Sequence, residues 1–300
     1  MISIIIASVK KDLLANVSKN ISETIGVEFE IISFDNSNGE RGLCELYNLG
    51  AKKAKYDVLC FMHEDISLDT INWGSIVFEL FNQDPKLGVL GVVGSSYKAL
   101  VPSGWAVENL HGQTIFANYI QSYKHSNKRK ELIYNKPSKD NPANVICVDG
   151  LWFCTRKSIA LEVSFDEQLL HGFHCYDIDF CLNVGRYFNV AVTFDILIHH
   201  FSEGSFDKDW LTDSIKVHKK WESILPKFTT PITLKQQRVF EKRAFKTLIK
   251  NLLIQKTSLK RIFQMLKSYQ GTKVMSTSLY LKLNYYTIKY YFLDNKSFNE

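Results

Sequence analysis

The chain has 300 residues, of which 45% are hydrophobic and 23% are charged, a composition that excludes a disordered or collagen-like protein. Apolar runs such as residues 2–7 are far shorter than the roughly 20 residues that a membrane-spanning helix needs. Lys10 and Lys11 follow this first apolar run instead of preceding it, so we expect no secretory signal and a cytoplasmic protein. The six cysteines form no CxxC pair, and we expect reduced thiols in a hydrophobic core.

The net charge of +6 is unevenly distributed along the chain. Residues 1–234 carry 23 Lys and Arg against 28 Asp and Glu, whereas residues 235–300 carry 14 against 3. Charge split this sharply indicates two functional units. It also argues against a nucleic-acid binder that is basic throughout.

The first part of the chain predicts a parallel sheet. Strand-like and helix-like segments alternate over residues 2–9, 12–25, 29–34, 43–55 and 57–62. Because parallel strands need crossover helices, this order predicts a doubly wound α/β fold. Ligands bind beyond the carboxyl ends of the strands in such sheets, so we expect Asp35 and the group His63–Asp65 on the same edge.

The middle of the chain is less regular. We predict a long loop insertion over 97–144, with a hairpin near 105–118. Around it we predict a helix at 71–81, strands at 88–94, 145–155 and 190–200, and a helix at 177–187.

The last part, residues 233–300, is predicted to be a basic, amphipathic, mainly helical extension that follows a domain at 1–232. Residues 245–253 and 259–266 each place apolar side chains on one helical face with lysines and arginines around it, and 279–292 is ambiguous between helix and strand. Such helices either associate with an anionic inner-membrane surface or pack their apolar faces on the main domain or in a homodimer. The sequence leaves both alternatives open.

Three ionisable residues end the strand at 57–62. Side chains at alternate positions point the same way, so His63 and Asp65 lie side by side. An imidazole and a carboxylate can hold a divalent cation, which in turn can hold a diphosphate. A solvated turn with a capping Asp is the alternative interpretation.

Two further groups carry candidate chemistry. Asp177 and Asp179 open a predicted helix, where a carboxylate can act as a general base or simply cap the helix. His199 and His200 end the last strand and point to opposite faces, so at most one of them faces a given site.

The order of these segments resembles the glycosyltransferase family 2 group, which has the GT-A fold, mostly parallel and Rossmann-like. Asn48, Gly50 and Ala54 match its N-x-G-x-x-x-A element, and His63–Asp65 occupies the place of its D-x-D motif. Val148–Gly150 resembles its acceptor-side strand.

The later segments of the chain also follow the order of the family motifs. Residues 165–167 and 177–182 resemble the F-D-E and E-D-x-D-L-C-L stretch, which carries the catalytic base. Residues 200–205, with Lys220 and Trp221 downstream, are similar to the H-x-S-x-G-S ending of a bacterial subgroup. The resemblance covers about residues 1–222.

Two positions depart from the family pattern. His63 replaces the first aspartate of D-x-D, and Tyr176 replaces the glutamate of the E-D pair. Asp177 is then the residue aligned with the catalytic base. A catalytically degenerate binding module on the same fold, or a polyanion-binding protein acting through the basic extension, are the alternatives to an active enzyme.

The resemblance implies a metal-dependent, inverting glycosyltransferase of bacterial surface-polysaccharide synthesis. It would move a sugar from a nucleotide-diphosphate sugar to a glycan or lipid-linked acceptor, at the inner face of the membrane and without a nucleic-acid partner. Trp105 is a further candidate for sugar stacking. The implied site residues are Asp177 as catalytic base; Asp35, Asn48, His63 and Asp65 for the donor; Asp65, His200 and His63 for Mg²⁺ or Mn²⁺; and Gly150, Trp152 and Asp179 for the acceptor.

Overall fold

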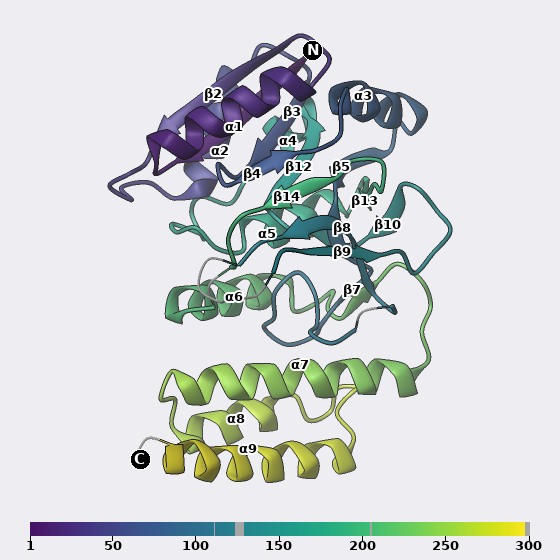
Figure 1. The fold of residues 1–300 in the computed structure, drawn as a ribbon. Coiled ribbons are helices and arrows are strands. Elements are labelled where there is room, and N and C mark those ends of the chain that lie inside the picture. Colours follow the sequence, from purple (N-terminus) through teal and green to yellow (C-terminus); the bar gives the residue numbers. More distant parts are fainter. Residues whose placement is uncertain (111, 124–128, 205, 298–300) are drawn as a thin grey trace.

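The computed structural model describes residues 1–110, 112–123, 129–204 and 206–297. Figure 1 shows a mixed α/β body built on sheets, with the last three helices of the chain stacked beneath it. The chain therefore has the α/β body and the helical carboxyl-terminal region that the sequence predicts.

The main sheet has seven strands in the order β10-β13-β5-β12-β3-β1-β2. β1 is parallel to β2 and β3, and β13 is parallel to β5, as the strand–helix alternation predicts. The strand β12 joins these two halves and is antiparallel to both β3 and β5, because a turn at residues 150–151 breaks the predicted strand at 145–155. The strands are Ala143–Val145 (β10), Asn189–Val192 (β13), Leu87–Gly91 (β5), Trp152–Arg156 (β12), Val58–Met62 (β3), Ile2–Ser8 (β1) and Phe29–Asp35 (β2).

Helices cover both faces of this sheet because its central strands are apolar on both sides. In β1, Ile4 and Ile6 belong to the hydrophobic cluster under α1 and α3, whereas Ile5 belongs to the cluster under α2, α4 and α5. Alternation of side chains along the strand thus supplies both cores. The helices are Lys11–Thr24 (α1), Leu43–Lys53 (α2), Trp73–Gln83 (α3), Lys157–Val163 (α4), Tyr176–Val184 (α5) and Lys208–Trp221 (α6).

A second sheet corrects the prediction for the middle of the chain. Its order is β11-β6-β8-β14-β4, with β9 paired to β8, and a short pair β15-β7 lies apart. The predicted strand at 88–94 divides between the two sheets, and the insertion at 97–144 contributes strands instead of one long loop. Its hairpin joins β8 to β9, not residues 105–118. The strands are Cys147–Val148 (β11), Val93–Ser95 (β6), Ile115–Gln121 (β8), Ile198–His200 (β14), Ile66–Leu68 (β4), Glu131–Asn135 (β9), Lys227–Phe228 (β15) and Tyr97–Lys98 (β7).

The chain ends in the helices α7 (Leu234–Ile254), α8 (Leu259–Ser268) and α9 (Thr277–Ser297). A capping box begins α7, with the Thr233 hydroxyl accepting from the backbone N–H of Gln236. The segment 279–292, ambiguous in the sequence, is helical. No helix within the described residues is both long enough and apolar enough to cross a membrane.

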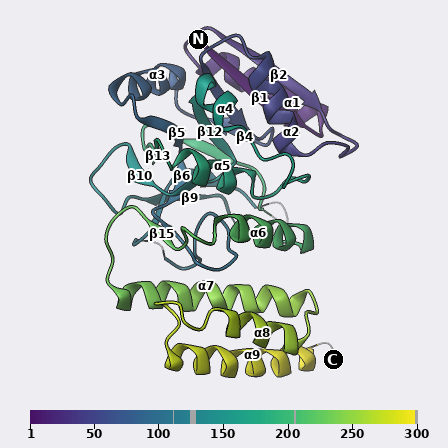
Figure 2. The ribbon, with the colours of Figure 1, turned by 180° about the vertical axis from the view of Figure 1, so that it is seen from behind.

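The apolar faces predicted for 245–253 and 259–266 are used inside the protein. Phe245, Ile249, Ile262 and Leu266 are fully buried. Figures 1 and 2 show α7 between the α/β body and the pair α8 and α9. The apolar face of α7 therefore packs within the chain beside the main body, and that of α8 is buried within the chain as well.

A buried carboxyl group fastens α7 to the body. Glu241, fully buried, accepts hydrogen bonds from the Tyr97 hydroxyl at 2.6 Å and from the backbone N–H of Leu100 at 2.8 Å. Burial raises the pKa of Glu241 to about 7. The carboxyl-terminal helices are thus joined to the body by a polar contact inside the core.

Candidate metal and catalytic site

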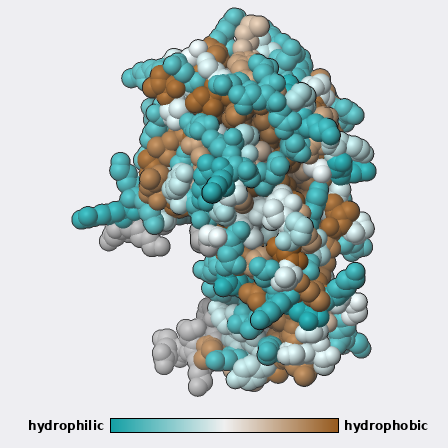
Figure 3. Space-filling view, turned by 90° about the vertical axis from the view of Figure 1, so that its right-hand side faces the viewer, coloured by the Kyte–Doolittle hydropathy of each residue, from teal (hydrophilic) through white to brown (hydrophobic). Residues whose placement is uncertain are grey.

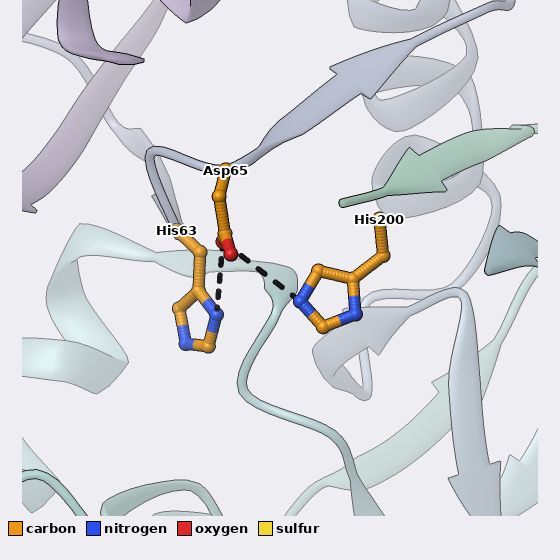
Figure 4. A group of neighbouring side chains, drawn as sticks. All are labelled: His63, Asp65 and His200. Carbon is orange, nitrogen blue, oxygen red and sulfur yellow. Dashed lines mark ion pairs between the residues drawn. The ribbon is translucent and has the colours of Figure 1, made fainter. Parts of the chain in front are cut away.

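Three side chains from the two predicted strand ends converge on one point (Figure 4). The Oδ1 atom of Asp65 lies 3.9 Å from Nδ1 of His63 and 3.8 Å from Nε2 of His200. Ligand atoms of all three residues lie within 4.8 Å of one another. These separations are too long for hydrogen bonds and leave room for an ion between the atoms.

The fold explains why the three residues meet. The turn His63–Asp65 connects β3 of the main sheet to β4 of the second sheet. The strand β14 then pairs with β4 so that His200 lies opposite Ile66, and the backbone N–H of Phe201 donates to the Asp65 carbonyl at 3.0 Å. Residues 135 positions apart in the sequence are therefore neighbours by strand register.

Glu64, between the two candidate ligands, points the other way. Its carboxylate is buried and accepts from the Ser8 hydroxyl at 2.6 Å and from the backbone N–H groups of Val9 and Lys10 at 3.2 and 3.3 Å. This contact ties the turn to the end of β1. Glu64 therefore holds His63 and Asp65 in place without lying in the cluster itself.

The outer nitrogen of His63 is fixed by Tyr176. The Tyr176 hydroxyl donates its proton to the Gly150 carbonyl at 3.1 Å and lies 3.0 Å from Nε2 of His63. Because that hydroxyl has only one proton, Nε2 of His63 is the donor in the second contact. In the neutral ring the lone pair then sits on Nδ1, which faces Asp65.

His200 and Asp65 are oriented in the same manner. Nδ1 of His200 lies 3.2 Å from Oε1 of Gln121, an acceptor, so the lone pair of the neutral ring is on Nε2, toward Asp65. The Gln121 amide is itself fixed, because its nitrogen donates to the carbonyls of Ser122 and Ser202. The Ser202 hydroxyl donates to the outer oxygen, Oδ2, of Asp65.

This cluster fits a divalent cation. Two imidazole nitrogens and a carboxylate oxygen face one another, and each of the three side chains makes a further hydrogen bond, as ligands do in protein metal sites. The two nitrogen donors suit a transition metal such as Mn²⁺ better than Mg²⁺, which takes oxygen ligands. His199 faces elsewhere, with its Nε2 atom 2.7 Å from the Ser122 hydroxyl, so His200 is the histidine of this pair that lies in the cluster.

Asp177 lies in the first turn of α5, directly after the Tyr176 that contacts His63. Its carboxylate accepts from the backbone N–H of Gly150 at 3.0 Å and from that of Ile178 at 2.8 Å. Burial and the neighbouring carboxylate of Asp149 raise the pKa of Asp177 to about 7. A carboxyl group with a pKa near neutrality is suited to accept a proton at physiological pH.

Gly150 permits this arrangement. A Cβ atom at this position would lie 2.2 Å from the Tyr176 hydroxyl, so any larger residue displaces the group that orients His63. The Gly150 backbone therefore serves both candidate centres: its N–H contacts Asp177 and its carbonyl contacts Tyr176.

A cavity of about 590 Å³ is lined by His63, Tyr176 and Asp177. Its polar end includes His63, Asp149, Gly150 and Asp177. The rest of its wall carries several aromatic side chains and three residues of α7, namely Trp105, Phe173, Phe206 and Trp210 with Ala244, Thr247 and Asn251. The carboxyl-terminal helices thus contribute to the same cavity as the candidate catalytic residues.

Comparison with known proteins identifies the family. A family model described as "Glycosyltransferase like family" matches residues 3–221, well over half of the chain. The chain belongs to this glycosyltransferase-like family. No curated protein matches the sequence.

Solved structures share the fold of this chain. S. aureus TarS 1–349 in complex with UDP is 12% identical and has a TM-score of 0.56, over 99% of this chain and 91% of that one. The same fragment with UDP-GlcNAc has a TM-score of 0.54 at 12% identity and the same coverage. The likeness identifies the fold as that of the GT-A glycosyltransferases.

A longer TarS chain gives a TM-score of 0.55 at 12% identity, over 97% of this chain and 54% of that one. GalNAc-T7, crystallised with UDP, GalNAc and Mn²⁺, gives a TM-score of 0.47 at 11% identity, over 97% of this chain and 55% of that one. The chain therefore spans about half the length of these two proteins.

Three of the predicted site residues, Asn48, Trp152 and Asp179, are buried in the interior of the chain. Asp179 is buried, and its carboxylate accepts from Nε1 of Trp221 at 2.7 Å and pairs with Nζ of Lys220 at 2.8 Å. Asn48 holds the segment after α4, with its amide bonded to both the N–H and the carbonyl of Phe165 at 2.9 Å. These contacts are ones that fasten α5 and α2, and neither residue lines the cavity described above.

Trp152, predicted in acceptor binding, is fully buried and packs edge-on against Trp73. It presents no ring face to a sugar, because β12 is a central strand of the main sheet. Asp35 ends β2 beside Ser8, on the edge where β3 reaches His63, and is exposed. Its carboxylate accepts from the backbone N–H of Ser37, which lowers its pKa.

Sequence reasoning passed over two residues of the site. Asp149 lines the cavity, whereas its sequence context predicts only part of a strand, although a carboxylate before a glycine is a turn signal. Tyr176 was noted as a departure from the family motif and not as a partner of His63. Only the contact between distant segments identifies that role.

Proposed function

We propose that this glycosyltransferase is metal-dependent and inverting, and that it transfers a sugar from a nucleotide-diphosphate donor to a glycan or lipid-linked acceptor. One observation supports this most strongly: His63, which lies in the cluster with Asp65 and His200, and the Asp177 carboxylate line the same cavity, and Tyr176 and Gly150 join them. A degenerate binding module would have no need for a carboxyl group of raised pKa at that position.

The metal is proposed to bind through Nδ1 of His63, Oδ1 of Asp65 and Nε2 of His200. When bound, it would neutralise negative charge on the diphosphate of the departing nucleotide. Asp35, on the same sheet edge, is proposed to contact the nucleoside. Uridine-diphosphate sugars are the first donors to test, since two TarS structures of the same fold hold UDP and UDP-GlcNAc.

Asp177 is proposed as the general base. Its carboxylate would take the proton of an acceptor hydroxyl while that oxygen forms a bond to the anomeric carbon. The bond from this carbon to the diphosphate oxygen breaks on the opposite face, and the nucleoside diphosphate leaves with the bonding electrons. Attack from the opposite face inverts the anomeric configuration.

The aromatic part of the cavity is proposed as the acceptor subsite. Trp105 and Trp210 are wide apolar surfaces of the kind that stack on sugar rings. We propose that residues 1–232 carry the chemistry and that residues 233–300 complete this wall and attach the enzyme to the inner face of the membrane. A lipid-linked precursor of a surface polysaccharide is an acceptor that fits such a location.

The decisive experiment needs no acceptor. The full chain is incubated with UDP-glucose, UDP-galactose and their N-acetyl analogues, with and without Mn²⁺, and thermal unfolding is followed. We expect one donor to raise the melting temperature only when Mn²⁺ is present, because a ligand that binds the folded state alone stabilises it. Absence of any donor effect, also with GDP-, CDP- and dTDP-sugars, would contradict the proposal.

Stereochemistry is tested with the same donor. Slow transfer to water is followed by proton NMR, which distinguishes the two anomers of the released sugar before they equilibrate. An α-linked donor should give the β-sugar first. First release of the α-sugar would overturn the inverting mechanism while leaving donor binding intact.

A further inference from the structure

The helix α9 has a second apolar face that none of the described residues covers. Its inner face, with Leu279, Leu283 and Thr287, packs against α7 and α8 and is buried. A separate stripe is largely exposed, with exposed fractions of 62, 67, 44 and 62% for Leu281, Tyr285, Ile288 and Phe292.

The spacing of these four residues makes a continuous stripe. They follow one another at intervals of four, three and four positions, which places them on one side of an α-helix. At 3.6 residues per turn, the centre of this stripe lies roughly 170° from the centre of the buried face. The stripe therefore points directly away from the rest of the chain.

Figure 1 places α9 at the far end of the molecule, with α7 between it and the sheets. Figure 3 shows hydrophobic side chains exposed at this end, among hydrophilic ones. An apolar stripe at the outer tip of a protein is in position to meet a partner without a rearrangement of the body.

The charges around the stripe select the partner. Residues 235–293 contain 13 Lys and Arg and a single acidic residue, Glu241, which is fully buried. Lys282 and Lys289 are exposed and lie along one side of the stripe, roughly a quarter turn from its centre. The surface of these helices therefore combines positive charge with apolar side chains and presents no carboxylate in this range.

We infer that the stripe of α9 inserts into the surface of a membrane rich in anionic lipids. Apolar side chains would enter the boundary between headgroups and acyl chains, while the lysines contact lipid phosphates. A second copy of the chain is disfavoured because two such surfaces repel each other. A nucleic acid offers the anionic charge but no apolar layer to cover the stripe.

This inference deepens the proposed membrane attachment by naming its surface, and it does not depend on the transferase chemistry. It also places the attachment on a different helix from the two whose apolar faces the sequence identifies. The apolar faces of 245–253 and 259–266 are occupied inside the protein, whereas that of α9 is presented outward.

The experiment is flotation of the full chain with vesicles of phosphatidylcholine alone or with one quarter phosphatidylglycerol. We expect binding to the anionic vesicles only. In a variant with Tyr285→Ser, Ile288→Ser and Phe292→Ser, partitioning should fall on the order of tenfold or more, because each side chain loses apolar burial. The matched control is Ile71→Ser, which removes an equally exposed apolar side chain from the α/β body.

Each outcome decides the inference. Unchanged vesicle binding by the triple variant, or no binding of the unaltered chain to either vesicle, overturns it. A dimer that the triple variant converts to a monomer in analytical ultracentrifugation assigns the stripe to a second copy. Binding to polyuridylate without binding to vesicles assigns the basic surface to nucleic acid. Donor-dependent thermal stabilisation, measured on the same variant, reports separately on the proposed enzymatic function.

Discussion

The Nε2 atom of His63 lies 3.0 Å from the hydroxyl oxygen of Tyr176, and these are the two positions at which the chain departs from the family 2 motifs. A neutral phenol behind the imidazole keeps its Nδ1 atom directed at Asp65. The two departures therefore form one joint feature of the site. Each would look like the loss of a carboxylate if it were considered alone.

Removal of the Tyr176 hydroxyl tests this pairing. In Tyr176→Phe the ring still fills its place under Gly150, but His63 loses the partner that fixes its tautomer. We expect the affinity for Mn²⁺, measured by calorimetry, to fall by about 10-fold to 100-fold, as is typical when an outer partner of a metal ligand is lost. Tyr56→Phe removes a hydroxyl that contacts Glu28 on the surface and should leave the affinity unchanged.

Loss of a proposed ligand should have a larger effect. We expect Asp65→Ala to weaken Mn²⁺ binding by more than the roughly 100-fold that marks the upper limit for an outer partner. His199→Ala is the control, because His199 is adjacent to a proposed ligand in sequence and faces Ser122. Equal losses in the two variants would remove the cluster as the metal site.

Asp177→Asn keeps the size of the side chain and removes the base. Turnover should fall by at least about 100-fold, with donor binding nearly unchanged. In the unaltered enzyme the rate of the chemical step should rise with pH to about 7 and then level off, because Asp177 must be ionised. A normal rate in the variant would show that another group accepts the proton.

The same substitution should change stability in a pH-dependent way. The pKa of Asp177 is about 7 in the folded protein and ordinarily 3.8, so the folded state holds a proton that the unfolded state releases between these values. Stability from this group is present at low pH and is lost as pH rises toward 7. Without metal, the melting temperature of Asp177→Asn should therefore exceed that of the unaltered chain at pH 8 but not at pH 4. The expected rise is about 2–4 °C for each kcal/mol of stability gained.

Asp179 should be a residue of the core. Asp179→Ala leaves the buried Nε1 of Trp221 without its acceptor, while Lys220 keeps its contact with Asp166 at 2.8 Å. We expect urea denaturation to show a loss of about 1–3 kcal/mol. Glu162→Ala, at an exposed position of α4, is the matched control. A stable Asp179→Ala variant with a higher KM for the acceptor would restore Asp179 to the acceptor site.

The sequence predicts best what depends on local order. The strands β1, β2 and β3 and their crossover helices follow from hydrophobic spacing. The meeting of Asp65 with His200 is expected only from the family resemblance, because it depends on the register of β14 with β4 in the second sheet. Contacts that depend on tertiary packing cannot be predicted from the sequence. Asp177 lines a cavity, whereas Asp179 is buried in the core. The spacing of the two residues does not distinguish these environments.

The buried hydrogen bond from Tyr97 to Glu241 affects the design of truncated variants. The net charge changes sign near residue 233, which suggests a truncation at that point. A truncated body would leave the phenol and an amide of the β7 region without their acceptor, and would open one side of the chamber in which Asp177 sits. Composition divides the chain into an enzyme and an extension. The buried contacts and the shared cavity make the two parts one structural unit.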